Sequence, residues 1–200
     1  MIAHALLTLA ALAVSAGPAA SEHLLAGAGA FRDGRFDAAL VEFRVAERLG
    51  APDAGAYAGA ALVKLGRAEE AVEAFAASPP GDDELLAWYR AVACYDAKLF
   101  TCADRALAGI DQAGPKVAAE IGRLRAEIVR VLAPAPAVAS LDWYASRCEQ
   151  RRAEGRVALA AAYCREAVEL GGRRPDRHGV ARASAALTHL EPASLREVSR

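Results

Sequence analysis

The residues of this chain with the clearest chemical potential are four cysteines, Cys94, Cys102, Cys148 and Cys164. None of them lies in a CxxC motif, and none has a histidine at the spacing of a structural zinc site, so we expect no metal. Two roles stay open for the thiols. They can pair as disulfides in an oxidising compartment, or they can pack as small apolar side chains inside a core.

Catalytic chemistry has little support elsewhere in the sequence. The segment GAGAFRDG lacks both the preceding strand and the final glycine of a nucleotide-binding loop. The acidic run GDDELL indicates a helix start, because negative charge stabilises a helix N-terminus. The four histidines include no pair one helical turn apart; they are His4, His23, His178 and His189. We therefore expect a protein that is not an enzyme and that binds no cofactor.

A sequence pattern that occurs twice indicates which elements position the cysteines. The segments GRFDAALVEFRVA and GRAEEAVEAFAAS begin at Gly34 and Gly66, 32 residues apart, and share an alanine and a phenylalanine at the same places. The glycine ends one helix, because it adopts the left-handed cap conformation without strain. Apolar residues then recur at helical intervals and predict a second helix from Phe36 to about Leu49. Gly27 and Ala39 are small, which lets the two antiparallel helices approach closely.

Two weaker copies extend the pattern. In AVACYDAKLFTCADRALAGI, Lys98 stands at the place of the turn glycine, whereas YASRCEQRRAEGRVALAAAYCREAVEL restores it as Gly155. Between these copies, PKVAAEIGRLRAEIVRVL predicts an amphipathic helix over residues 115–132, and APAPAVAS predicts a non-helical connection after it. The structural positions that the copies share are Gly27, Gly34, Ala39, Phe43, Gly59, Gly66, Ala71, Phe75, Ala103, Gly155 and Ala160.

These units resemble the tetratricopeptide repeat (TPR) family, in an exported bacterial form, on their small residues, turn glycine and second-helix aromatic residue. The resemblance implies an all-α fold in which antiparallel helix pairs stack as a short, irregular TPR-like solenoid. It divides the chain into three TPR-like pairs over residues 21–114, an insert helix with a Pro/Ala linker over residues 115–140, and a fourth pair with a C-terminal capping helix over residues 141–200.

The resemblance also implies a concave groove, lined by the first helix of each pair, in which a hydrophobic or amphipathic segment of a partner protein binds. Mapped onto this sequence, the groove is lined by Leu24, Phe31, Val63, Trp88, Val92 and Tyr95. The alternative is that these side chains pack against neighbouring helices, including the insert helix if it folds back over them.

The spacing of the cysteines relates them to the predicted turns. Cys94 and Cys102 lie at equal distances from residue 98, and Cys148 and Cys164 lie at equal distances from residue 156. Residues at equal distances from the turn of an antiparallel hairpin lie opposite each other, so each pair can bridge its own hairpin if the Cα atoms are about 4.4–6.8 Å apart. Buried free thiols remain the alternative.

The first twenty residues differ from the rest, because they contain no Lys, Arg, Asp or Glu. Their apolar run over residues 5–16 is shorter than the roughly 20 residues that span a bilayer, and it suits the central part of a secretory signal peptide. We expect residues 1–20 to be a signal peptide, cleaved near Ala16 or near Ala19 and Ala20. The mature protein would then be periplasmic or secreted, without stable membrane insertion. An uncleaved anchor or the first helix of a cytoplasmic protein are the alternatives.

These observations predict a non-enzymatic scaffold or adaptor of the cell envelope that binds another protein. The alternative is a cytoplasmic TPR adaptor whose cysteines form a redox switch. The net charge of −1 argues against a nucleic-acid partner, and the sequence carries no signal for a particular oligomeric state.

Overall fold

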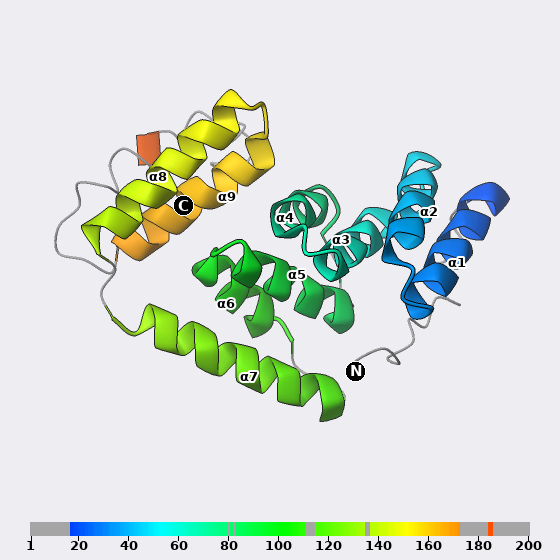
Figure 1. Ribbon diagram of the computed structural model, residues 1–200, viewed down its shortest axis with the longest axis horizontal. Helices are drawn as coiled ribbons and strands as arrows, with labels where there is room; N and C mark the ends of the chain where they lie inside the picture. The colour runs from blue at the N-terminus through cyan, green and yellow to red at the C-terminus, as the bar shows by residue number, and fades with distance from the viewer. Residues whose placement is uncertain are drawn as a thin grey trace.

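The computed structural model describes residues 17–79, 81, 83–110, 115–134, 137–172 and 184–185. Within these ranges the regular elements are all α-helices, as the sequence predicts. The helices are α1 (Pro18–Arg32), α2 (Phe36–Arg48), α3 (Ala54–Lys64), α4 (Ala68–Ala77), α5 (Glu84–Asp96), α6 (Phe100–Ala108), α7 (Pro115–Leu132), α8 (Val138–Ala153) and α9 (Val157–Gly171), as Figure 1 shows.

Helix positions follow local sequence preferences closely. α2 spans Phe36–Arg48 and buries an apolar face, so the predicted second helix of the first pair is confirmed. α7 has the predicted bounds, because Pro115 fits a first helical turn and apolar residues follow at helical intervals. α5 begins directly after Asp83, whose carboxylate accepts hydrogen bonds from the backbone N–H groups of Leu85 and Leu86 at 2.9 and 3.0 Å.

The helices form four antiparallel pairs, α1–α2, α3–α4, α5–α6 and α8–α9. Three of these pairs turn at Gly34, Gly66 and Gly155, whose φ angles are +77°, +71° and +76°. Each glycine N–H donates to the carbonyl oxygen three residues earlier, and the next N–H donates to the carbonyl oxygen five residues earlier, at 2.9–3.1 Å. These bonds satisfy the last carbonyl groups of the first helix, and only a left-handed residue permits them.

The α5–α6 turn has the same geometry although lysine replaces the glycine. Lys98 has a φ of +64°, and its N–H donates to the carbonyl oxygen of Tyr95 at 2.9 Å. The N–H of Leu99 donates to the carbonyl oxygen of Cys94 at 2.8 Å. A residue with a Cβ atom is strained in this conformation, so the third pair keeps the turn without the residue that suits it best.

Within the first two pairs, a glycine of the first helix faces a phenylalanine of the second. A Cβ atom on Gly27 would lie 2.6 Å from the Phe43 ring, and one on Gly59 would lie 2.9 Å from the Phe75 ring. The close approach therefore joins Gly27 to Phe43 rather than to Ala39, because the aromatic ring fills the space that the missing side chain leaves. The shared alanines Ala39, Ala71, Ala103 and Ala160 have no exposed surface.

The second half of the chain departs from a simple row of pairs. α5, the first helix of the third pair, packs against both helices of the preceding pair, α3 and α4. α7 packs in the same way against α5 and α6, so α7 occupies the position that the first helix of a further pair would have. The α8–α9 hairpin then folds back, and α9 packs against α4 and α6 (Figure 1). The fourth hairpin thus contacts the second helices of the two preceding pairs.

The non-helical connection after α7 is shorter in the structure than the sequence predicts. α8 begins at Val138, so residues 138–140 are helical, because a proline restricts only its own position and the residue before it. Of the predicted signal peptide, residues 1–16 lie outside the described part of the chain, and residues 17–20 lie within it. The predicted capping helix lies mostly outside them too, although Ser184 and Ala185 are helical.

Candidate binding cleft

The four cysteines form the two pairs that the sequence predicts. The Cα atoms of Cys94 and Cys102 lie 5.8 Å apart across the α5–α6 hairpin, and those of Cys148 and Cys164 lie 5.3 Å apart across the α8–α9 hairpin. Both pairs are disulfide-bonded, and three of the four side chains are buried. The bridges fix two of the three hairpins that bound the cleft described below, α5–α6 and α8–α9.

Two of the six residues predicted to line a concave groove are core residues. Leu24 and Trp88 are only 2% and 8% exposed, because neighbouring helices cover them. The remaining four side chains are half-buried and pack against the core; they are Phe31, Val63, Val92 and Tyr95. Leu24 and Trp88 are therefore not accessible to a partner in this fold.

The first-helix face is closed by the protein's own side chains. The Phe31 ring of α1 meets the Tyr89 ring of α5 edge-on at a centroid distance of 5.9 Å, and the Lys64 ammonium lies 5.5 Å from the Tyr89 centroid. Residues 54–62 of α3, which packs against α2, α4 and α5, are all buried. Side chains of the protein itself therefore cover the centre of the first-helix face.

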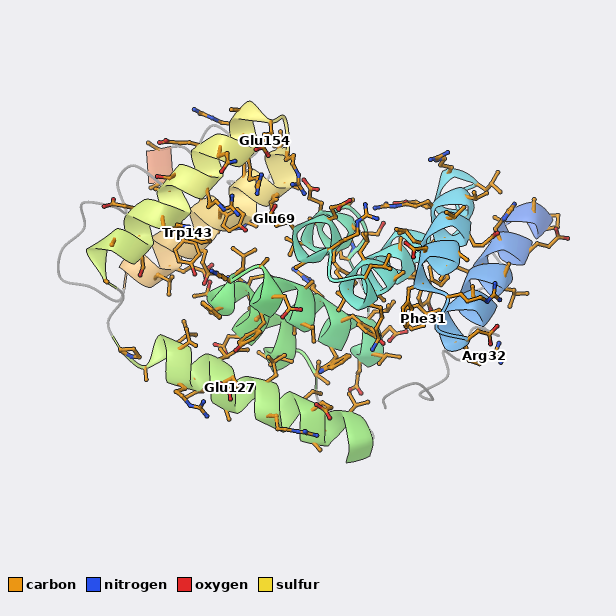
Figure 2. The ribbon with its side chains drawn as sticks, in the orientation of Figure 1. Phe31, Arg32, Glu69, Glu127, Trp143 and Glu154 are labelled. Atoms are coloured by element: carbon orange, nitrogen blue, oxygen red, sulfur yellow. A yellow bond between two sulfur atoms is a disulfide. The ribbon has the colours of Figure 1, made fainter. Side chains whose placement is uncertain are left out.

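A cleft of about 360 Å³ opens where the fourth hairpin meets the turns of the second and third pairs. Residues 66–70 and 96–98 form one side of it, and Trp143, Arg147, Arg156 and Tyr163 form the other. Glu69 and Trp143, both labelled in Figure 2, come from α4 and α8 and lie on these two sides. The cleft therefore exists only because α8–α9 folds back.

Trp143 is the aromatic residue that the cleft presents to solvent, with 37% of its surface exposed. The ammonium of Lys98 and the guanidinium carbon of Arg147 each lie 5.5 Å from its ring centroid. The rings of Tyr144 and Tyr163 contact it edge-on at 4.9 and 5.9 Å. Cations this close to an aromatic ring are attracted by its electron-rich face, so the three side chains form one preorganised unit.

Glu69 is the centre of an ion-pair network along one edge of the cleft. Its carboxylate lies 2.8 Å from the guanidinium of Arg151, 3.2 Å from that of Arg156 and 3.5 Å from that of Arg147. It also accepts a hydrogen bond of 2.8 Å from the Tyr163 hydroxyl. These contacts join α4 to both helices of the fourth hairpin.

The network sets the charge of Glu69. Burial alone would raise the pKa of its carboxyl group, but the hydrogen bonds from Tyr163 and Arg151 and the positive charges of Arg151 and Arg147 outweigh burial and lower the pKa. The carboxylate is consequently ionised throughout the neutral pH range. Its charge is balanced inside the protein, so it contributes little attraction for a free cation.

Two tyrosines fix the hairpin to the third turn. The Tyr144 hydroxyl donates to the backbone carbonyl of Lys98 at 2.5 Å, and the Tyr163 hydroxyl lies 3.3 Å from the carbonyl oxygen of Ala97. Burial raises the pKa of both phenols, so each keeps the proton that it donates. The backbone of the Lys98 turn is therefore held in place independently of the lysine side chain.

No family model, curated protein or solved structure matches the chain. Among the residues that the structure describes, no group of His, Cys, Asp and Glu side chains is arranged to hold a metal ion. In the same part of the chain, no helix is long and apolar enough to cross a membrane. The chemistry of the cleft thus has to be judged from its own side chains.

Sequence reasoning did not identify Trp143 and Arg147 as site residues, because it assigned the accessible surface to the first helices. One signal was present. Lys98 stands at a turn position that is glycine in the three other pairs, and a strained non-glycine residue is a recognised mark of functional positions. The pairing of Lys98 with Trp143 could not be read from the sequence, because it depends on how the fourth hairpin folds back.

Proposed function

We propose that the protein is a non-enzymatic scaffold of the cell envelope that binds another protein in the cleft beside its fourth hairpin. The observation that carries the proposal is the half-exposed ring of Trp143 at the cleft, with Lys98 and Arg147 against it. Tryptophan and arginine are among the residues that supply most of the binding energy in protein interfaces. A resemblance to TPR proteins, which bind partners through helix pairs, points the same way.

The charged groups of the cleft suit binding better than catalysis. Glu69 has a lowered pKa and is held by arginines, whose guanidinium groups stay protonated. A general acid or base works best with a pKa near the working pH, and Glu69 is far from that condition. Fixed charges on disulfide-braced hairpins are instead what a preorganised recognition surface needs.

The proposal includes export through the predicted signal peptide. Two disulfides are compatible with an oxidising compartment. α1 begins at Pro18 and buries Ala20, so cleavage after Ala16 keeps this helix whole, whereas cleavage after Ala20 removes its first turn. We expect the mature chain to begin at Gly17. Sequencing the N-terminus of the isolated protein tests this, and an intact Met1 contradicts export.

The redox-switch alternative predicts a different state of the cysteines in living cells. A switch needs accessible thiols that exchange between two states, whereas Cys94, Cys148 and Cys164 are at most 1% exposed. Thiol alkylation in intact cells, followed by mass measurement, separates the two ideas. Four unmodified, oxidised cysteines support the exported scaffold, and alkylation of the cysteines in growing cells supports the switch.

Site-specific photo-crosslinking tests partner binding directly. A photo-reactive amino acid replaces Arg67, which lines the cleft, in one variant and leaves Trp143 in place. It replaces Val41 in a control variant, because Val41 is 61% exposed on α2 and does not line the cleft. We expect irradiation of the cell envelope to join a discrete protein to the first variant and not to the second. No adduct with either variant, or equal adducts with both, contradicts the proposed function.

A further inference from the structure

We infer that the ligand of the cleft is an acidic peptide segment of the partner, in which carboxylates alternate with large apolar side chains. This inference rests on the proposed function and specifies its chemistry. Lys98 and Arg147 would bind the carboxylates, and Trp143 would contact an apolar side chain between them.

The Lys98 turn indicates a role for the lysine side chain. Gly34, Gly66 and Gly155 form the same turn with the same hydrogen bonds and without strain, so the fold itself does not need a lysine there. A lysine adds an ammonium group at the mouth of the cleft. Strained residues that a fold does not need are found at binding sites, where the surrounding structure holds them in place.

Two positively charged side chains of the cleft, Lys98 and Arg147, are available to bind carboxylates of a ligand. Arg67 is bound to Glu70 at 2.5 Å, and Arg156 is bound to Glu73 at 2.7 Å, so neither guanidinium is free to attract a ligand strongly. Lys98 forms no ion pair with the described residues. Arg147 reaches Glu69 only at 3.5 Å, and that carboxylate is already bound more closely by two other arginines.

Asp96 is the carboxylate of the cleft that no described cation pairs. Burial raises the pKa of its carboxyl group. It lies two residues before Lys98, on the α5 side of the turn. We therefore expect the carboxylates of an acidic ligand to lie nearer to Arg147 than to Asp96.

The exposed ring of Trp143 gives the cleft an apolar contact for the ligand. Other large apolar side chains with high exposure, such as Val41, Val129 and Val157, lie on outer helix surfaces and do not line the cleft. Trp143 offers an apolar surface next to two cations, which matches an apolar side chain flanked by carboxylates. A nucleic acid fits less well, because three carboxylates line the same cleft and the whole chain has a net charge of −1.

The test uses the oxidised, full-length mature protein and a fluorescent synthetic peptide of alternating Glu with Phe or Leu. Fluorescence anisotropy measures its binding, and the same peptide with Gln in place of Glu is the comparison. We expect the acidic peptide to bind at least about tenfold more tightly than the Gln peptide, and this preference to weaken as salt is added. Equal binding of the two peptides, or tighter binding of a single-stranded oligonucleotide, overturns the inference.

The variant Lys98→Gly separates binding from stability. It removes the ammonium group but restores the residue that suits the turn, and the carbonyl group that accepts the Tyr144 hydrogen bond remains. We expect it to bind the acidic peptide about tenfold less tightly while its midpoint of thermal unfolding is equal to or above that of the natural protein. A lowered midpoint together with weaker binding would mean that the lysine is structural, and unchanged binding would also overturn the inference.

Asp53→Gly is the matched control. Asp53 is the other non-glycine residue with a left-handed backbone among those described, with a φ of +59°, and it does not line the cleft. It should leave peptide binding unchanged, and it should raise stability less than Lys98→Gly does, because aspartate adopts this conformation more readily than lysine. The two experiments also separate failure of this inference from failure of the proposed function. A crosslinked partner combined with no preference for the acidic peptide rejects this inference alone, whereas failure of the crosslink rejects the scaffold itself.

Discussion

The Glu166 carboxylate of α9 accepts hydrogen bonds from both the backbone N–H and the hydroxyl group of Thr101, in the first turn of α6. The N–H donates at 2.8 Å, and the N–H of Cys102 adds a longer bond of 3.3 Å. Both Glu166 and Thr101 are buried. The residue before α6, Leu99, has no capping side chain, so a glutamate from the fourth hairpin caps this helix instead.

Replacing Glu166 with alanine should weaken the attachment of the fourth hairpin. The Glu166→Ala variant leaves the buried N–H of Thr101 and the partly buried N–H of Cys102 without this acceptor, so we expect the free energy of unfolding to fall by about 2–3 kcal/mol. Urea unfolding followed by circular dichroism measures this. The control is Glu169→Ala, one turn along α9, which loses a surface ion pair with Arg105 and should cost less than about 1 kcal/mol. Equal losses in the two variants would contradict the capping role.

The protonation of Glu166 should make stability depend on pH. Burial raises the pKa of its carboxyl group from the ordinary 4.5, although hydrogen bonds from Thr101 and Cys102 oppose burial. Because the folded protein holds this proton more tightly than the unfolded chain, the contribution of Glu166 to stability is full below pH 4.5 and is lost as the pH rises through the raised pKa. Glu166→Gln keeps an acceptor for the Thr101 N–H but does not titrate.

Comparing the two proteins isolates this effect from all other titrating groups. We expect the natural protein to lose stability relative to Glu166→Gln as the pH rises from 4.5 toward neutrality. Urea unfolding of both proteins in a series of buffers gives the difference at each pH. A constant difference across the series would mean that the carboxyl group has the same pKa in the folded and unfolded states.

Two glycines of α1 should respond in opposite directions to alanine. A Cβ atom on Gly27 would lie 2.6 Å from the Phe43 ring, whereas a Cβ atom on Gly29 would meet nothing within 4 Å. Gly27→Ala should therefore lower the free energy of unfolding by about 1–3 kcal/mol through overpacking. Gly29→Ala should raise it by about 0.5–1 kcal/mol, because alanine favours the helix. Thermal unfolding of both variants tests the pair, and a stable Gly27→Ala protein would contradict the close contact.

Local features of this fold could be predicted from the sequence, because short-range rules control them. The period of apolar residues sets α2 and α7, and the left-handed turn requires Gly34, Gly66 and Gly155. The same geometry indicates which cysteines can pair, since residues equally far from a turn face each other, although it left buried free thiols as the alternative. The turn at Lys98 could also be placed from the sequence, because the repeat spacing of the neighbouring pairs determines its position.

The position of the fourth hairpin could not be predicted in the same way. It depends on the contacts of Glu69 with Arg151 and of Thr101 with Glu166, between residues 82 and 65 positions apart in the sequence. Single charged residues on predicted helices look like solvent-exposed residues, and periodicity does not tell which surfaces meet. For the same reason, the sequence left open whether Trp88 lines a groove or packs against neighbouring helices, and it is buried. The cleft is formed by these long-range contacts.

The Cys148–Cys164 disulfide takes the place of a packing contact that the first two pairs make. Cys148 precedes its turn glycine by as many residues as Gly27 precedes Gly34, and Cys164 follows it by as many as Phe43 follows Gly34. In the first pair these positions hold glycine against phenylalanine, and in the fourth they hold the two bonded cysteines. The bond therefore joins two positions that the repeat geometry already brings together.

Because the two bonded cysteines occupy the positions of glycine and phenylalanine in the first pair, a glycine–phenylalanine contact should partly replace the disulfide. Replacing Cys148 and Cys164 with alanine removes a bridge that spans 16 positions, so we expect a loss of about 3 kcal/mol in the free energy of unfolding. Cys148→Gly combined with Cys164→Phe restores the small and large pair of the first two repeats and should recover part of that loss, because the ring fills the cavity that two alanines leave. Urea unfolding under non-reducing conditions compares the two double variants. If the glycine and phenylalanine variant is the less stable one, the two positions are equivalent in backbone register but not in packing.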